Sequence, residues 1–269
     1  MPENPSCEFP PGYDGAALLG RLERVLDPEL DESILALGFV RSLRLRAGDL
    51  EVVLRLPTSW CAVNFAYLMA EDVRHALQAA PLVRRVRISL GDHCAAAQIE
   101  AAVNAGRSFA EAFSIEGAGS LETLRRTFLR KGFLLRQERL LHGLRRSGVS
   151  AATICALRLA DVAVAGDTIV VRRPGSAAVE AGSAGVLLQR YLERRAELAL
   201  DCDPAAPLIV ALDGTKLSVE RLEAHYAAAR TMRVAMEANG AFCRALSNLQ
   251  RSEDALPSPQ FVGGADVPP

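Results

Sequence analysis

Cys61 is the residue whose type and position best suit chemistry. It ends a loop segment, LPTSWC at residues 56–61, and the apolar spacing after it predicts a helix over 62–79. A helix N-terminus carries unpaired N–H groups and partial positive charge, and both stabilise a thiolate. A thiolate is a nucleophile and a soft metal ligand. The alternative is a buried, unreactive thiol beside a helix start that Thr58 and Ser59 cap.

A second group of candidate ligands, Asp92-His93-Cys94, directly follows an apolar segment at 83–90. Carboxylate, imidazole and thiolate all bind iron or zinc. If this turn and the Cys61 loop lie together, Cys61, His93 and Cys94 are candidate ligands of one metal ion. The alternative is that Asp92 caps a helix starting near Cys94, with His93 exposed beside it.

The elements that must position these residues form a compact α/β pattern. Helical spacing covers residues 13–26, and alternating apolar residues at 43–54 surround Ala47-Gly48-Asp49, which predicts a hairpin. The 62–79 helix and a third strand at 83–90 complete the order helix, two strands, helix, strand. We therefore expect an α/β (α+β) fold, with a small mixed-sheet domain first and a mainly helical second domain.

The second half begins with a long predicted helix at 121–146 that is rich in arginine. Its basic face could be simply solvated. Alternatively, it could bind nucleic acid or an acidic partner such as the first domain. Gly148 is expected to stop it. Further on, we expect strands at 168–173 and 208–212 and helices at 184–200 and 219–249.

Charge changes sign along the chain. Up to Ala118 there are 11 basic and 16 acidic residues, and from Gly119 onward 20 and 16. The change coincides with a small, flexible run at 116–120, which predicts a domain boundary. The expected domains are residues 13–118 and 120–250, followed by a disordered tail at 251–269 that is rich in proline and glycine.

Composition narrows the class of protein. Half of the 269 residues are hydrophobic and the formal net charge is −1, so a sizeable core is expected and whole-protein capture of nucleic acid or membrane is not. No run of eighteen apolar residues predicts a membrane span, and residues 1–12 lack the basic start of a secretory signal. Six cysteines without a Cys-x-x-Cys pair indicate free thiols, most of them small buried hydrophobes, in a reducing cytoplasm.

Four features in order resemble the PaaD/SufT-like family of iron–sulfur cluster assembly domains. They are Asp27-Pro28-Glu29, the segment LGFV at 37–40, the hairpin and the Thr-x-x-Cys spacing at 58–61. The resemblance implies that Cys61 is the family's reactive cysteine, Thr58 its loop threonine, and Asp27 with Glu29 its acidic pair. The family usually has proline after the cysteine, whereas Ala62 stands here, so the first helical turn lacks that constraint.

A longer set of segments is similar to one subgroup of this family, encoded beside soluble di-iron monooxygenases. The segments are residues 60–69, 92–93, 104–109 and 124–137. This likeness implies a maturation factor, acting as carrier or adaptor rather than as an enzyme, that holds iron or an iron–sulfur cluster transiently. The implied partner is a client metalloprotein such as a di-iron monooxygenase component, and a homodimer is a further option.

The second half also resembles the catalytic domain of tyrosine recombinases, at residues 147–150, 156–162 and 213–218. Ser150 stands where that family requires an arginine, and no His-x-x-Arg-His segment follows, so phosphoryl transfer would lack its cationic clamp. The alternative function is therefore a DNA-associated regulator built on an inactive domain. A third alternative, thiol catalysis at Cys61, has no histidine placed by the sequence to pair with it.

Overall fold

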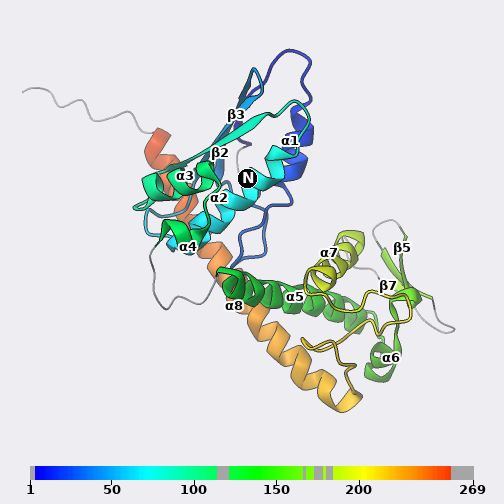
Figure 1. The fold of residues 1–269 in the computed structure, drawn as a ribbon. Coiled ribbons are helices and arrows are strands. Elements are labelled where there is room, and N and C mark those ends of the chain that lie inside the picture. Colours follow the sequence, from blue (N-terminus) through cyan, green and yellow to red (C-terminus); the bar gives the residue numbers. More distant parts are fainter. Residues whose placement is uncertain (1–3, 114–120, 166–167, 173–177, 180–183, 256–269) are drawn as a thin grey trace, which may run out of the picture.

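The computed structural model describes residues 4–113, 121–165, 168–172, 178–179 and 184–255. The helices and strands form two groups, a mixed sheet with helices and then a mainly helical part (Figure 1), which confirms the predicted α/β class. The expected boundary at 116–120 and residues 256–269 of the expected tail lie outside the described residues. Within the described residues, no helix is both long and apolar enough to cross a membrane.

The first group of elements, which we call the first module (residues 6–113), contains one four-stranded sheet. Its elements are β1 (Ser6–Glu8), α1 (Gly15–Leu22), β2 (Val40–Arg46), β3 (Asp49–Arg55), α2 (Val63–Gln78), β4 (Arg85–Gly91), α3 (Ala96–Ala105) and α4 (Phe109–Ala112). The strand order is β1-β2-β3-β4. Strands β2 and β3 are antiparallel, whereas β1 and β4 run parallel to their neighbours. The predicted hairpin and third strand are present, and β1 is an addition.

Two residues form the hairpin turn between β2 and β3. Arg46 pairs with Asp49, so Ala47 and Gly48 alone connect the strands. Both have positive φ, 49° and 88°, as a two-residue turn of the primed type requires. This turn sets the register that places Leu50, Val52 and Leu54 of β3 on the buried face.

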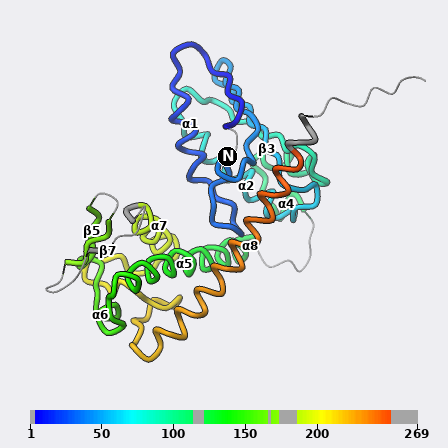
Figure 2. The backbone as a smooth tube through the Cα atoms, turned by 180° about the vertical axis from the view of Figure 1, so that it is seen from behind, coloured from blue at the N-terminus to red at the C-terminus, as the bar shows by residue number. Residues whose placement is uncertain are grey.

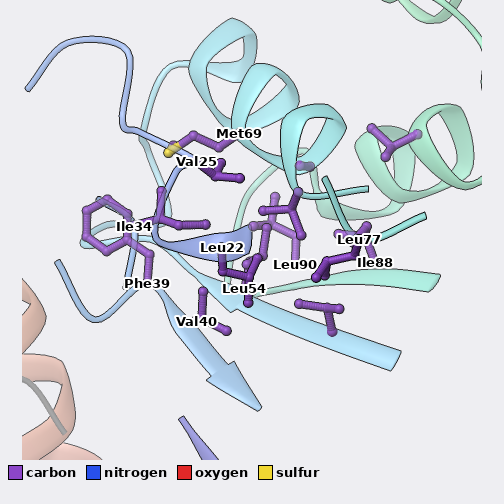
Figure 3. Packing of buried hydrophobic residues seen from close by; sticks show 14 of the residues in the cluster. Leu22, Val25, Ile34, Phe39, Val40, Leu54, Met69, Leu77, Ile88 and Leu90 are labelled. Carbon is purple, nitrogen blue, oxygen red and sulfur yellow. The ribbon is translucent and has the colours of Figure 1, made fainter. Parts of the chain in front are cut away.

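Helices α1 and α2 cover that buried face. Figure 3 shows Leu22 of α1, Met69 and Leu77 of α2 and Leu90 of β4 among the side chains that meet in this core. Helix α1 is shorter than predicted: it begins after Asp14, whose Oδ1 accepts the N–H of Ala16, and ends at Leu22. The chain from 23 to 39 is therefore irregular, and it includes an acidic loop at residues 27–32.

The second module (residues 121–222) surrounds a separate core. Its elements are α5 (Leu121–Arg146), α6 (Ala151–Ala156), the 3₁₀ turn Leu159–Asp161, β5 (Val162–Ala165), β6 (Thr168–Val171), β7 (Ala178–Val179), α7 (Ala184–Glu197) and the start of α8 (Val219–Ala255). Helix α5 has the predicted bounds, and Gly148 follows it with a φ of 76°. Leu208, Ile209 and Val210 are buried in this core.

The expected strand at 208–212 is wrong. The segment makes isolated main-chain bridges, Pro207 with Arg158 and Val210 with Lys216, instead of a continuous ladder, and side chains bind two of its carbonyl groups. Tyr191 Oη donates to the carbonyl oxygen of Leu208 at 2.6 Å, and Gln137 Nε2 donates to that of Val210 at 2.9 Å. The segment is thus buried without being a strand, and the carbonyl groups of Leu208 and Val210 have hydrogen-bond donors.

Helix α8 joins the two modules. It continues to Ala255, past the predicted end at 249 and into the expected tail at 251–269. Figure 1 and Figure 2 both show its C-terminal half beside the first module, far from its start. Arg244 of α8 pairs with Glu32 of the acidic loop at 2.5 Å, so the contact is also specific.

Two of the basic residues of α5 meet acids of the first module, one of the arrangements left open by the sequence. Arg125 makes a two-oxygen pair with Asp72 of α2, at 2.8 and 2.9 Å. Arg136 of α5 and Arg194 of α7 both bind the buried carboxylate of Asp31. These three arginines are consequently engaged within the molecule.

Candidate functional site

The cysteine loop (residues 56–62) connects β3 to α2 and carries the predicted reactive residue. Helix α2 begins at Val63 with Ala62 as N-cap, and no side chain caps it. Cys61 therefore lies just before the helix and is partly buried against the first core. Its Sγ is 3.3 Å from Thr58 Oγ1. Thr58 thus contacts the thiol directly, and the cap that the sequence suggested for Thr58 or Ser59 is not formed.

The turn after β4 holds the cysteine loop in place. His93 Nδ1 accepts the N–H of Ala95 at 3.1 Å, so the ring's proton sits on Nε2, which donates to the carbonyl oxygen of Cys61 at 2.8 Å. The N–H of Cys94 donates to the carbonyl oxygen of Ser59 at 3.0 Å. The cysteine loop and the turn after β4, which carry the candidate metal ligands expected from the sequence, therefore lie together.

Two expectations for this turn need correction. Asp92 caps no helix: it has a φ of 52° and pairs with Arg55 at 2.8 Å, and α3 starts after Ala95. His93 is not exposed but is 7 % accessible.

The three-ligand arrangement of Cys61, His93 and Cys94 is also absent. Both nitrogens of His93 are engaged, and the described residues contain no group of three or more His, Cys, Asp or Glu side chains able to hold a metal ion. In this arrangement His93 positions the cysteine loop, while Cys94 is exposed. Cys61 remains the thiol that the loop presents.

The predicted acidic pair divides into two roles. Asp27 is buried, and its Oδ1 accepts the N–H groups of Glu29 and Leu30, both at 2.9 Å. Burial raises the pKa of Asp27 to about 6, because it outweighs these two hydrogen bonds. Asp27 therefore shapes the acidic loop, whereas Glu29 directs its carboxylate to the side chain of Asn239 on α8.

Helix α8 adds a thiol that the sequence did not connect with this site. Cys243 packs partly buried against the first core. Burial first, and then the electrostatic influence of Asp27, Cys61 and Glu29, raises the pKa of Cys243 to about 11. Three of the four residues that the resemblance singled out, Asp27, Glu29 and Cys61, thus affect a side chain that lies far along the chain from each of them. No local pattern in the sequence indicates this, because the link depends on the path of α8.

Trp60 is the exposed feature of the cysteine loop. Its side chain is 81 % accessible, the highest value among the large hydrophobic residues exposed in the described part of the chain. Tryptophan is among the residue types that contribute most to protein–protein contacts when a partner buries them. The site therefore combines a partly sheltered thiol with an accessible aromatic contact.

A family model of known proteins matches the part of the chain that contains the cysteine loop. Residues 16–90 match the family model of iron-sulfur cluster assembly proteins. The matched segment includes Asp27, Glu29, Thr58 and Cys61. It covers less than half of the 269 residues, and it leaves out His93, Cys94 and the whole second module. No curated protein and no solved structure matches the chain.

Proposed function

We propose that this protein is an iron–sulfur cluster assembly factor that holds iron or a cluster through Cys61 and passes it to a client metalloprotein. The observation that carries the proposal is the Thr58–Cys61 contact inside the segment that matches the assembly family. A hydroxyl at 3.3 Å from the sulfur can donate to a thiolate, and thiolates are preferred ligands of iron in clusters.

The rest of the loop supports a carrier rather than a permanent metal site. A resident structural site normally uses three or four protein ligands, and the described residues hold no such group. Cargo held by few protein ligands keeps open coordination positions, through which a client's own ligands can take it over. Trp60 supplies exposed apolar area beside the thiol for contact with that client.

The client that we propose is a component of a soluble di-iron monooxygenase. This part of the proposal is supported by the subgroup resemblance at 60–69 and 104–109, which includes Trp60 and Cys61 themselves. The second module would then bind the client or position the first module on it.

The test is transfer of cargo from the full chain. The protein is loaded anaerobically with iron and sulfide, desalted and mixed with an apo acceptor protein whose activity reports cluster uptake. We expect transfer from the wild type and from Cys94→Ser, whose thiol is exposed in the neighbouring turn, and loss of transfer from Cys61→Ser. Equal transfer from Cys61→Ser would contradict the proposal.

A further inference from the structure

A basic cleft lies along β4, the edge strand of the four-stranded sheet. It has a volume of about 760 Å³ and is lined by residues of α2, β4 and α3. Among its described lining residues, one is an acid, Glu100, none is aromatic, and four are arginines: Arg74 of α2, Arg84 in the turn before β4, and Arg85 and Arg87 of β4. These side chains carry a net charge of +3 in a hollow of the size that small molecules occupy.

Side chains of α3 already bind the main chain of β4 beside this cleft. Asn104 Oδ1 accepts the N–H of Ile88 and Asn104 Nδ2 donates to the carbonyl oxygen of Ile88, both at 2.8 Å. Glu100 Oε1 accepts the N–H of Leu90 at 2.6 Å. The edge of β4 is therefore blocked here against an added strand, and the carboxylate of Glu100 is engaged.

The two arginines of β4 are not neutralised by the neighbouring strand. Arg85 and Arg87 lie across from Asp49 and Glu51 of β3, yet no ion pair joins them in the described part of the chain. Glu51 pairs instead with Arg44 of β2, at 3.7 Å. Both guanidinium groups are thus open to an anion.

The other two arginines also lack an acidic partner among the residues that the structure describes. Arg74 Nε is buried without a hydrogen-bond acceptor, and a buried donor in that state is costly. Arg84 donates to the carbonyl oxygen of Ala47, a neutral group that leaves the positive charge uncompensated. An anion in the cleft would supply the missing negative charge to all four side chains.

The cleft is separate from the cysteine loop. Arg85 pairs with Asp49 beside the hairpin turn, whereas Gly91 pairs with Arg55, which directly precedes the cysteine loop. A strand rises by about 3.3 Å per residue, so the two ends of β4 are roughly 20 Å apart. A ligand held by Arg85 and Arg87 therefore occupies a second site.

We propose that this cleft binds a small molecule that carries a diphosphate group. A guanidinium group presents parallel N–H donors that match two oxygens of a phosphate. A terminal phosphate carries about 1.5–2 negative charges at pH 7, so two linked phosphates balance the charge of the cleft better than one carboxylate does. The described lining residues offer no aromatic ring on which a base could stack, which argues against a nucleic-acid strand.

The test is calorimetric titration of the full chain with inorganic pyrophosphate at physiological ionic strength. We expect Arg85→Gln and Arg87→Gln each to weaken binding by about tenfold or more, because each removes charged donors from the cleft. Arg46→Gln is the matched control. Arg46 is an exposed arginine of β2 that pairs with Glu8 and does not line the cleft, so this variant should bind as the wild type does.

A second measurement uses the wild type alone. The protein is treated with the arginine reagent phenylglyoxal, with and without pyrophosphate, and the modified arginines are identified by peptide mass spectrometry. We expect pyrophosphate to slow the modification of Arg85 and Arg87 and not that of Arg46. This readout stays decisive if a substitution in β4 disturbs the sheet.

Titration with ADP identifies the source of the diphosphate. Affinity equal to that of pyrophosphate supports recognition of the diphosphate group alone, and tighter binding supports a nucleotide. No binding of pyrophosphate by the wild type would overturn the proposal. Equal weakening by Arg46→Gln would overturn it too, since it indicates general electrostatic attraction, and so would equal affinity for citrate, which carries carboxylates. The proposed function stands in each case, because Cys61 takes no part in this cleft.

Discussion

The imidazole of His93 donates a hydrogen bond of 2.8 Å to the main-chain carbonyl of Cys61. The ring is almost fully buried, and its other nitrogen accepts the N–H of Ala95. This single side chain therefore fixes the cysteine loop against the turn after β4. A residue that looks like a metal ligand in the sequence acts here as a positioning residue for the thiol.

The first prediction concerns this bond. His93→Ala leaves the carbonyl of Cys61 and the N–H of Ala95 without their partner, so we expect a loss of about 1–3 kcal/mol in the free energy of unfolding. The cysteine loop should also open more often, and alkylation of Cys61 should become faster. Denaturant unfolding and a timed maleimide reaction measure the two effects. The control is His75→Ala, since His75 is exposed on α2; equal behaviour of the two variants would refute the positioning role.

The second prediction concerns pH. Because the folded pKa of Asp27 is about 6 and the unfolded value is about 3.9, the native state binds more protons between these values. The contribution of Asp27 to stability thus falls as pH rises through that window, by up to about 3 kcal/mol. The Asp27→Asn side chain keeps an oxygen that can accept the N–H groups of Glu29 and Leu30, but it cannot ionise.

We therefore expect Asp27→Asn to be more stable than the wild type at pH 7.5, with the difference shrinking as pH falls towards 4. Unfolding curves at several pH values between these limits measure the difference. If the difference in the free energy of unfolding between the two proteins does not change with pH, ionisation of Asp27 does not destabilise the folded state.

The third prediction concerns the connection between the modules. Asp31 is buried and binds Arg136 with two bonds, at 2.6 and 2.9 Å, together with Arg194. Asp31→Asn leaves two buried guanidinium groups without their carboxylate, which typically costs about 3–5 kcal/mol. Asparagine tolerates the φ of 55° at this position, so the backbone is not the cause of the loss.

Thermal unfolding measures this effect, and Glu8→Gln is the matched control. Glu8 also accepts from two arginines, Arg44 and Arg46, but on the exposed surface. We expect the control to unfold as the wild type does. If Asp31→Asn also does so, the buried cluster does not hold the modules together.

The sequence was sufficient for the elements that local patterns determine. The hairpin around Gly48, the bounds of α5 and the stop at Gly148 follow from alternation, helical spacing and glycine. The strand expected at 208–212 is wrong because the segment makes isolated bridges instead of a continuous ladder, and the distant side chains of Gln137 and Tyr191 bind two of its carbonyl groups.

The site was predictable only in part. The cysteine loop and the acidic loop each carry a local motif, so Thr58, Cys61, Asp27 and Glu29 could be chosen from the sequence. Cys243 could not, because its packing against the first core depends on the path of a 37-residue helix that starts in the second module. The role of His93 was missed for a related reason. Every residue has a main-chain carbonyl, so the sequence does not indicate which one a histidine will bind.

The fourth prediction concerns the client surface. Trp60 is 81 % accessible, so Trp60→Ala should leave the melting temperature unchanged. If Trp60 contacts the client, its loss should weaken binding by about 2 kcal/mol, roughly 30-fold, and slow cargo transfer accordingly. The control is Leu82→Ala, which removes another exposed apolar side chain, 75 % accessible, from the turn that precedes β4. Unchanged transfer by Trp60→Ala would exclude this loop as the client contact.

The fifth prediction addresses the central claim, that Cys61 carries the cargo. The measurement is the amount of iron and sulfide that remains bound per chain after anaerobic loading and desalting, compared among the wild type, Cys61→Ser and Cys94→Ser. We predict that the wild type and Cys94→Ser retain equal amounts and that Cys61→Ser retains about a tenth or less. Retention by Cys61→Ser equal to that of the wild type would contradict the account.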